Sequence, residues 1–343
     1  WEPFISGKQS LRDFMFCVES GHALLARLLL AKATEDHEFF AGTHYDGMDE
    51  YFRGLQGFGD TINLDAFPVA ADNLIDDMQE QLVEGLFQDD IFIWWTDGYA
   101  EQLSRGHETG PRQFKKVAEG TGSIERVSEA TRDRFSRAVA EIFFNVLRFD
   151  FENVEGDLLG DLYQRYFDPE TRKALGEFYT PQPVIDYIMD GVGYERGVAN
   201  ERLIDPACGS GTFLVEAVER YLEDVERYED DPDWEEHLRD LCTRPRIVGL
   251  DIHPFAVLMA QIRFVVAILP AYREAKRQAQ RENREFTLRR LPIYRTDTLR
   301  NERELTGADL GDDGSRQLTF DAMTEDEQDV RIPVPLPVEV DAD

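Results

Sequence analysis

Apolar residues recur at helical spacing through the first half of the chain. Three runs, near residues 24, 138 and 158, show the spacing that turns one face of a helix toward a core. They consist of Leu24, Leu25, Leu28 and Leu29; of Ala138, Ile142, Phe143, Val146 and Leu147; and of Leu158, Leu159, Leu162, Tyr163 and Tyr166. The pattern predicts a helical domain over residues 1–166.

From residue 167 onward, helix signals alternate with short apolar runs. Asp168-Pro169 and Thr180-Pro181 are each typical of a helix start, because a capping side chain is followed by proline. Helices are expected at 212–228 and from Pro254 onward, and strands at 202–205, 246–251 and 291–295. The expected buried faces are Val184, Ile185, Ile188 and Met189, and then Val257, Leu258, Gln261, Ile262, Val265 and Val266. This order predicts an α/β fold with a parallel, doubly wound sheet.

Residues 301–343 read as an acidic loop that leads to a ribbon. Apolar residues alternate strictly from Val330 to Val340, but prolines occupy three intervening positions and cannot donate to a strand ladder. We therefore expect an edge ribbon in this segment. The predicted organisation is a helical domain at 1–166, an α/β part at 167–300 and this tail.

Charge adds a second constraint on the chain. It carries 69 acidic and 37 basic side chains, a formal net charge of −32, and the acids are spread along its whole length. In concentrated salt the self-repulsion of such a chain is screened within about 3 Å. The composition therefore favours a halophilic, cytoplasmic protein. Three widely spaced cysteines predict no disulfide and no metal site, and the apolar runs are too short for a membrane span of about 20 residues.

The sharpest motif is a glycine-rich turn after the first expected strand. Asp205-Pro206-Ala207-Cys208-Gly209-Ser210-Gly211 separates that strand from the helix that follows. Such a turn brings backbone N–H groups and a helix N-terminus up to a ligand. A dinucleotide fingerprint requires a third glycine where this chain has Leu214, and a phosphate-binding P-loop requires a lysine that is absent here.

Acidic residues follow all three expected strands. Asp205 and Asp251 end the first two strands, and Asp297 follows the third. Carboxyl ends of parallel strands share one edge of a sheet, where ligands of such folds bind. We expect Asp205 and the turn amides near an amino-acid tail, Asp251 at ribose hydroxyls and Asp297 at an adenine amino group. S-adenosylmethionine (SAM) fits this description better than NAD.

Two linked motifs carry a resemblance to a known family. Gly176-Glu177-Phe178-Tyr179-Thr180-Pro181, followed by the turn and Thr212-Phe213-Leu214, resembles the gamma-class DNA adenine-N6 methyltransferases of restriction-modification systems. These include type I modification subunits and type IIG fused enzymes. The resemblance covers residues 158–298 and implies a Rossmann-like SAM-dependent methyltransferase domain, truncated in this chain.

The resemblance also implies roles for individual residues. Residues Phe178, Tyr179, Thr180 and Pro181 would cover the methionine end of SAM. Its amino-acid portion would be held by Asp205, Ala207, Cys208, Gly209 and Gly211. Asp251-Ile252 matches the ribose-binding strand end, and Asp297-Thr298 matches the adenine-binding turn. The implied partners of the full enzyme are double-stranded DNA and specificity or restriction subunits.

One element of that family is missing from the sequence. Its members use (Asn/Asp)-Pro-Pro-(Tyr/Phe/Trp) to hold a flipped adenine, and this chain has no such tetrapeptide. The nearest segment, Asp231-Pro232-Asp233-Trp234, lacks the second proline and precedes the second strand. Glu274-Ala275-Lys276 matches the end of a nuclease motif but is better explained as a solvated helix end. We therefore expect a SAM-binding fragment, beginning at Trp1 without methionine, that is inactive alone.

Two alternatives stay open at this point. The chain could be part of a SAM enzyme that acts on RNA or protein, or it could be a non-catalytic subunit that binds SAM or DNA for assembly. A truncated sheet would also leave the first strand with an unpaired edge. The ribbon at Val330–Val340 is a candidate to cover that edge, although its prolines argue against central pairing.

Overall fold

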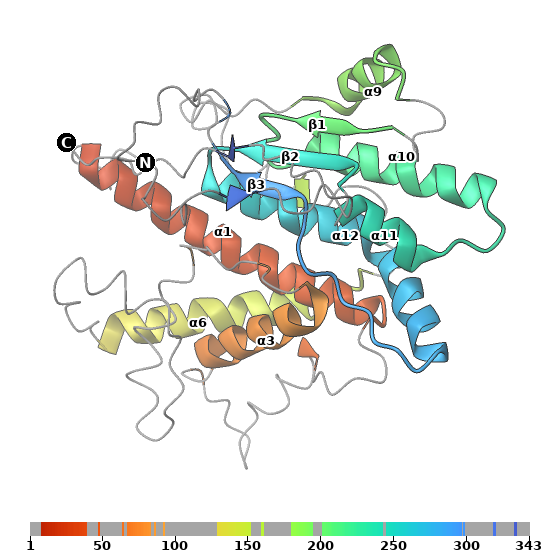
Figure 1. Cartoon of the computed structure of the whole chain (residues 1–343). Helices are drawn as coiled ribbons and strands as arrows, with labels where there is room; N and C mark the ends of the chain where they lie inside the picture. The colour runs from red at the N-terminus through yellow and green to blue at the C-terminus, as the bar shows by residue number, and fades with distance from the viewer. Residues whose placement is uncertain are drawn as a thin grey trace, which may run out of the picture. The chain divides into compact units, whose positions relative to one another are not determined.

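The computed structural model describes residues 8–39, 47–48, 64, 67–83, 86, 92, 129–151, 159–160, 180–194, 201–242, 245–296, 298, 318–319 and 333–334 (Figure 1). These residues are mostly helical and contain a small parallel sheet. The chain divides into two compact units, residues 1–81 with 88–154 and residues 82–87 with 155–343. The predicted domain boundary at residue 166 and the predicted helix start at Asp168 lie outside the described residues.

The first unit is built from helices, as the apolar spacing predicts. It contains α1 (Lys8–Asp36), most of α3 (Phe67–Leu82) and α6 (Glu129–Val146). Leu24 and Leu28 of α1 are buried, as is Phe143 of α6. The rings of Phe67 and Phe143 meet edge to face, with their centroids 5.6 Å apart. Large apolar side chains on neighbouring helices thus form a common core.

The second unit contains a parallel sheet in the order β1-β2-β3. The strands are β1 (Leu203–Asp205), β2 (Ile247–Asp251) and β3 (Ile293–Arg295). Ile204 of β1 pairs with Val248 of β2, and Leu250 of β2 pairs with Tyr294 of β3. All three predicted strands are present, each shorter by one or two residues at its start.

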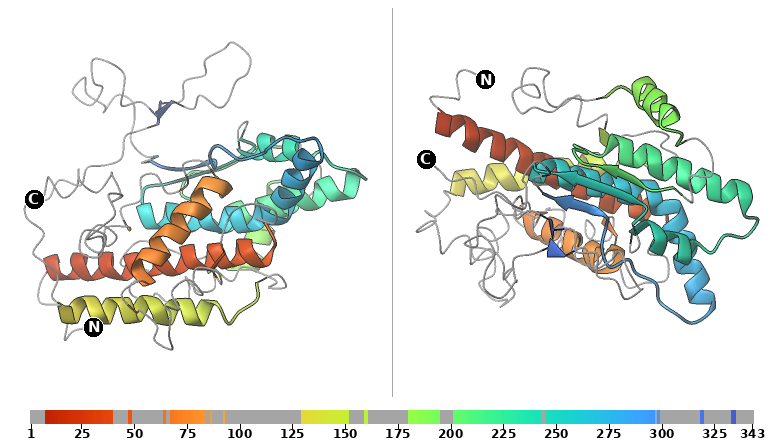
Figure 2. Two further views of the ribbon diagram at one scale, coloured as in Figure 1. Left: turned by 90° about the horizontal axis from the view of Figure 1, so that it is seen from below. Right: turned by 45° about the horizontal axis from the view of Figure 1, so that its top comes forward.

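Two long helices connect the three strands. α10 (Thr212–Tyr228) follows β1, and α12 (Pro254–Arg281) joins β2 to β3. Figure 2 shows both helices running beside the sheet, and both contact β2. The predicted bounds of α10 match the structure, and Pro254 does open α12.

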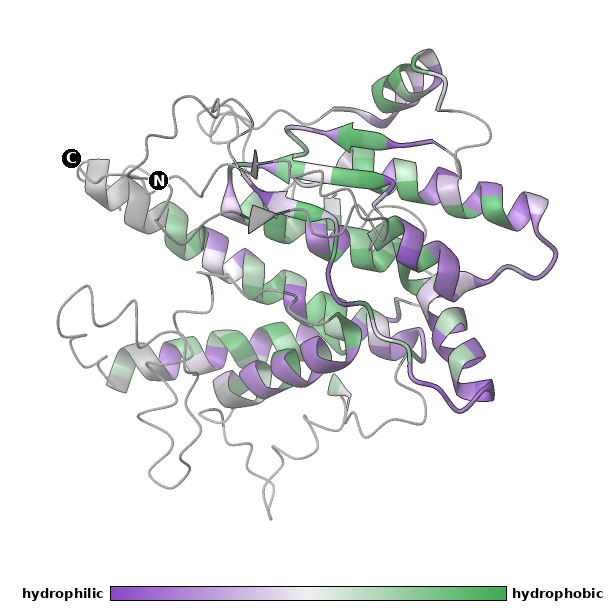
Figure 3. Cartoon of the chain, viewed as in Figure 1, coloured by the Kyte–Doolittle hydropathy of each residue, from purple (hydrophilic) through white to green (hydrophobic). Residues whose placement is uncertain are grey.

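α12 is buried almost all round, whereas the sequence predicts a single apolar face. Its buried residues include Phe255, Met259 and Phe264 in addition to four of the six residues of the predicted stripe, whereas Gln261 and Val266 are only half-buried. By length and composition alone this helix could cross a membrane, but 78% of its most apolar window is buried inside the protein. The hydropathy colouring in Figure 3 shows purple, hydrophilic residues on the last turns of α10 and at the end of α12. α12 is therefore the central core helix of this unit.

Three local predictions in this unit are wrong. The expected acidic loop at 229–236 ends early, because α11 (Trp234–Cys242) begins inside it, with the Asp233 carboxylate accepting the Glu236 N–H at 3.1 Å. The expected solvated helix end at Glu274-Ala275-Lys276 lies within α12. Ala275 is fully buried there, and the Lys276 ammonium lies 5.8 Å from the centroid of the Tyr272 ring.

The third error concerns α9 (Gln182–Gly191), which begins after Pro181. Ile185 and Met189 are buried as predicted, but Val184 is 44% exposed and Ile188 is 40% exposed. The spacing does predict which residues share a face of the helix. It does not predict that Ile188 borders an open cavity or that Val184 is exposed.

Two short segments complete the description of this unit. β4 (Leu318–Thr319) and β5 (Pro333–Val334) pair with each other in antiparallel fashion. The predicted ribbon is thus paired in its described part with residues 318–319 and not with β1. The Tyr272 hydroxyl donates to the Leu82 carbonyl at 2.6 Å and accepts the Leu288 N–H at 2.8 Å. This tyrosine therefore links Leu82 to Leu288 in the segment before β3.

Candidate functional site

The glycine turn follows β1 and leads directly into α10. Gly209 has φ of 53° and Gly211, the N-cap of α10, has φ of 86°. Both values lie in the left-handed region, which glycine adopts without strain. The Gly211 backbone also lies against α12, because a Cβ at this position would come within 2.9 Å of the Ala260 Cβ. The glycines are thus needed for backbone geometry as well as for access to a ligand.

Asp251, at the end of β2, joins this turn to the loop after β2. Its Oδ2 accepts the Gly209 N–H at 2.8 Å, and its Oδ1 accepts the His253 N–H at 2.8 Å. The Cys208 N–H adds a further link by donating to the Leu250 carbonyl at 2.9 Å. Each carboxylate oxygen of Asp251 keeps acceptor capacity beyond its backbone bond. Asp251 can therefore hold the two loops together and still accept hydrogen bonds from a ligand.

Asp205, at the end of β1, lines the same cavity as Asp251. Its Oδ1 accepts the Ala207 N–H at 3.1 Å. Burial raises the pKa of its carboxyl above the ordinary value, the bond from Ala207 opposes this shift, and the negative charge of Asp251 adds to it. Both Asp205 and Asp251 line the same cavity. Asp297, the third predicted acid, lies outside the described residues.

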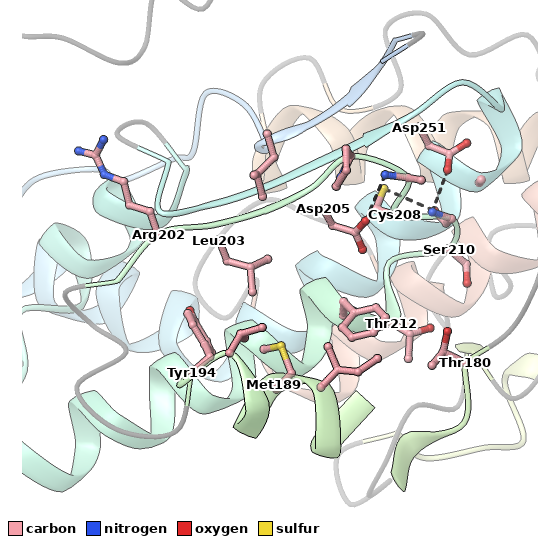
Figure 4. Close-up of a pocket in the computed structure, with 18 of the residues that line it drawn as sticks. Thr180, Met189, Tyr194, Arg202, Leu203, Asp205, Cys208, Ser210, Thr212 and Asp251 are labelled. Atoms are coloured by element: carbon pink, nitrogen blue, oxygen red, sulfur yellow. Dashed lines mark hydrogen bonds between the residues drawn. The ribbon is translucent and has the colours of Figure 1, made fainter. Parts of the chain in front are cut away.

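One cavity of about 1040 Å³ borders these groups. This volume is at the upper end of the roughly 300–1,000 Å³ typical of small-molecule sites. Figure 4 shows Leu203 and Asp205 of β1 on one side of the hollow, with Met189 of α9 and Tyr194 on the other. Most of the lining residues come from α9 and the residues after it, from β1, from the glycine turn and the start of α10, and from the loop after β2 with the first turn of α12.

The cavity brings together most of the described residues that the sequence assigns to cofactor binding. Those that line it are Thr180, Asp205, Ala207, Cys208, Gly209, Asp251 and Ile252. Pro181, Gly211 and Thr298 are described but do not line it, and the Thr298 hydroxyl instead donates to the Pro206 carbonyl at 3.0 Å. Phe178 and Tyr179 lie outside the described residues.

Sequence reasoning missed one wall of the cavity. It is formed by α9 and the residues after it, and its members are Ile188, Met189, Val192, Gly193 and Tyr194. The available signal was the apolar stripe of α9, which was assigned wholly to the core. Ser210, Phe213 and His253 were also missed, although each is close in sequence to a predicted site residue.

A charged network holds this wall against α10. Arg220 of α10 donates to Glu216 at 2.5 Å, to the Asp190 carboxylate at 2.7 Å and to the Tyr194 carbonyl at 2.9 Å. The Gln182 amide donates to Glu216 at 2.6 Å. Because Arg220 bonds both ends of the segment from Asp190 to Tyr194, it fixes the side of the cavity opposite β1.

Two further titratable groups beside the turn have pKa values shifted toward their neutral forms. Burial raises the pKa of the Cys208 thiol far above its usual range, and Asp251 and Asp205 reinforce this effect. Burial lowers the pKa of His253, despite the opposing influence of Asp251. A neutral thiol and a neutral imidazole suit ligand contact better than nucleophilic attack. Within the described part of the chain, no group of three or more His, Cys, Asp or Glu side chains is arranged to hold a metal ion.

The tetrapeptide most similar to a catalytic motif has a structural role. Trp234 begins α11 and is only 7% exposed, so its ring is part of the core. Its backbone N–H donates to the Pro232 carbonyl at 3.0 Å, and the Gln278 amide of α12 donates to the same carbonyl at 2.9 Å. The Trp234 ring therefore cannot stack on a base without unfolding the first turn of α11.

Comparison with known proteins supports the predicted resemblance. Residues 154–267 match the N-6 DNA Methylase family. The adenine-specific methyltransferase PglX of Streptomyces coelicolor is 35% identical over 33% of this chain and 9% of its own length. The type I restriction enzyme MjaVII methylase subunit of Methanocaldococcus jannaschii is 41% identical over 22% of this chain and 13% of its own length. The type II methyltransferase M.VspI of a Vibrio species is 27% identical over 37% of this chain and 31% of its own length.

The chain thus spans between 9% and 31% of the length of these relatives. The matched family segment runs from before α9 into α12, so it contains Asp205, the glycine turn and Asp251. The similarity therefore falls on the residues that build the cavity. The resemblance of this chain to the DNA adenine methylases of restriction-modification systems, predicted from its two linked motifs, is confirmed over residues 154–267.

Proposed function

We propose that residues 167–300 form the SAM-binding part of a Rossmann-like methyltransferase domain. The observation that supports this most strongly is the hydrogen bond between the Asp251 carboxylate and the Gly209 N–H. It joins the carboxyl ends of β1 and β2 around one cavity, where a ligand of a parallel sheet binds. The described lining of the hollow offers acceptors for hydroxyl groups and lacks the lysine of a phosphate-binding P-loop.

Each end of SAM has a proposed place in or beside this cavity. Asp205, Ala207, Cys208, Gly209 and Gly211 hold the amino-acid end, with the carboxylate of Asp205 toward its ammonium group. Asp251 accepts the ribose hydroxyls, and Ile252, which is 52% exposed, offers an apolar surface to the adenine. Asp297 and Thr298 complete the adenine site, and Phe178, Tyr179, Thr180 and Pro181 cover the methionine end. When bound, SAM supplies the electrophilic methyl group.

We further propose that the full enzyme methylates adenine N6 in double-stranded DNA, within a restriction-modification system that has specificity or restriction subunits. Support comes from the family match and from the similarity to an adenine-specific methyltransferase and a type I methylase subunit. This chain alone would bind SAM without transferring its methyl group, because it lacks the (Asn/Asp)-Pro-Pro-(Tyr/Phe/Trp) tetrapeptide. A halophilic, cytoplasmic setting stays a prediction from charge alone.

Calorimetric titration of the 343-residue chain with SAM tests this proposal. The wild-type chain should bind SAM, and Asp251→Asn should weaken binding about 10-fold or more, because hydrogen bonds to a charged acceptor contribute roughly 1.5–3 kcal/mol each. Asp230→Asn, in the exposed acidic loop, is the matched control and should bind as wild type does. Circular dichroism of each variant checks that the fold is retained.

Three results would each contradict part of the proposal. Absence of SAM binding by the wild-type chain would favour a non-catalytic assembly subunit. Transfer of labelled methyl groups to DNA by this chain alone would refute its expected inactivity, and transfer to RNA or protein would favour the other class of SAM enzyme.

A further inference from the structure

A buried arginine lies directly behind the glycine turn. Arg263 belongs to α12, where most of the surrounding residues are apolar, and it is only 2% exposed. A guanidinium group removed from water is costly unless its donors are bonded. This one donates from Nη1 to the Ser210 carbonyl at 2.5 Å, to the Ser210 hydroxyl at 2.9 Å and to the Thr212 hydroxyl at 3.2 Å. All of these acceptors belong to the turn or to the first residue of α10.

These bonds determine which way the turn presents its polar groups. Ser210 stands between the two left-handed glycines and lines the cavity. Because Arg263 holds its carbonyl, the negative end of that peptide is turned toward α12. The bond to Arg263 thus turns away from the cavity a carbonyl oxygen that would repel a carboxylate. The Gly211 N–H of the same peptide donates to the Cys208 carbonyl at 2.8 Å, which fixes the peptide in this orientation.

The charge of the guanidinium acts in the same direction. Asp205 and Asp251 both border the cavity and would repel the carboxylate of a ligand. The positive charge of Arg263 lies on the other side of the turn, close enough to lower the pKa of the neighbouring Cys208 thiol against the larger effect of burial. It therefore offsets part of the negative potential at the end of the cavity next to α10, where the N-terminus of that helix also favours an anion.

We propose that Arg263 is a positioning residue that makes the glycine turn selective for a ligand with a carboxylate-bearing amino-acid tail. This inference rests on the proposed function, because the tail in question is that of SAM. Arg263 acts through Ser210 and Thr212 and is not itself a catalytic residue. The sequence offers no motif for it, since it is 53 residues away from Ser210.

Two ligands with the same nucleoside separate this role from general stabilisation. S-adenosylhomocysteine has the amino-acid tail, whereas 5′-methylthioadenosine lacks it. Arg263→Gln keeps a hydrogen-bond donor but removes the charge, and Arg263→Lys keeps the charge but not the planar fork. In calorimetric titrations of the full chain, Arg263→Gln should weaken the binding of S-adenosylhomocysteine about 10-fold more than the binding of methylthioadenosine. Arg263→Lys should keep much of the preference for the tailed ligand.

Arg277→Gln is the matched control, because this arginine is on the same helix, 43% exposed and paired with Glu274. It should leave both affinities unchanged. Equal losses for the two ligands in Arg263→Gln would overturn the inference, since a merely structural role weakens the whole site alike. If Arg263→Gln does not fold, loss of the preference in a folded Arg263→Lys would overturn it instead. If the wild-type chain binds neither ligand nor SAM, the proposed function fails and the inference fails with it.

Discussion

Gly211 offers the sharpest test of how the turn is built. It adopts φ of 86° at the N-cap of α10, and its backbone lies against Ala260 of α12. Gly211→Ala therefore meets two separate costs. One is the left-handed conformation, and the other is a Cβ placed 2.9 Å from the Ala260 Cβ and 3.1 Å from its Cα. The second neighbour is backbone, so it cannot move aside as a flexible side chain would.

The two costs can be estimated and separated. A left-handed conformation costs a non-glycine residue about 1–2 kcal/mol, and forcing an extra methyl group into a packed core costs about 1–3 kcal/mol. Gly211→Ala should therefore lower the free energy of unfolding of this unit by about 2–5 kcal/mol. Gly193→Ala is the matched control, because Gly193 has φ of 81° and a Cβ added there would have no neighbouring atom within 4 Å. Gly193→Ala should show only the cost of the left-handed conformation, about 1–2 kcal/mol.

The assay must report on the unit that contains the turn. Two compact units need not unfold together, so a single spectroscopic transition is hard to assign. Hydrogen exchange of peptides from β1, α10 and β2, followed along a urea series, measures the opening of this unit directly. Equal destabilisation by Gly211→Ala and Gly193→Ala would show that the contact with Ala260 costs nothing, and would refute the packing argument.

Three further predictions concern other parts of the chain. Tyr272→Phe removes the hydroxyl that bonds two backbone groups, so we expect the free energy of unfolding to fall by about 1–3 kcal/mol. The control Tyr187→Phe, at a residue that is 80% exposed, should leave the free energy of unfolding unchanged. Glu19→Gln should flatten the pH dependence of stability. Burial raises the pKa of Glu19 from 4.5 to about 7, so the folded state holds a proton that the unfolded chain releases, and wild-type stability should fall as pH rises between these values. SAM affinity should fall on acidification as Asp205 becomes protonated, and titrations across pH should place the midpoint above the ordinary value of 3.8; a pH-independent affinity would contradict a role for its charge.

Local sequence signals predicted the parts of the fold that depend on local chemistry. The glycine turn, the start of α10 and the three strand ends follow from backbone and capping preferences that a short segment contains. The common edge of Asp205 and Asp251 also follows, because parallel pairing alone brings strand ends together. This is why most of the described residues that the sequence assigns to cofactor binding line one cavity, although they are far apart in sequence.

What the sequence did not predict depends on tertiary packing. Whether the apolar face of α9 meets a core or a cavity is decided by what lies opposite Ile188, which periodicity does not contain. In the sequence Arg263 is a single charged residue within an apolar helix, and its role becomes visible only in the structure, where it bonds the distant Ser210. α11 was missed because the acids that begin it, Glu235 and Glu236, read as a continuation of the acidic loop, although acids favour the first turn of a helix.

Under the proposed function, the arrangement of the sheet separates the binding of SAM from the transfer of its methyl group. The cavity needs only the ends of β1 and β2, the bond between Asp251 and Gly209, and the support of α10 and α12. β1 is nevertheless an edge strand within the described residues, pairing with β2 alone, and its Ile204 is 62% exposed. An exposed apolar edge invites pairing with another strand, and the described residues of β5 pair with β4 and leave it open. A strand added at this edge would extend the sheet beside the cavity without displacing any residue that links β1 to β2. Under the proposed function, residues that act on the methyl group of SAM can therefore be supplied from that side while the proposed SAM site keeps its contacts between β1 and β2.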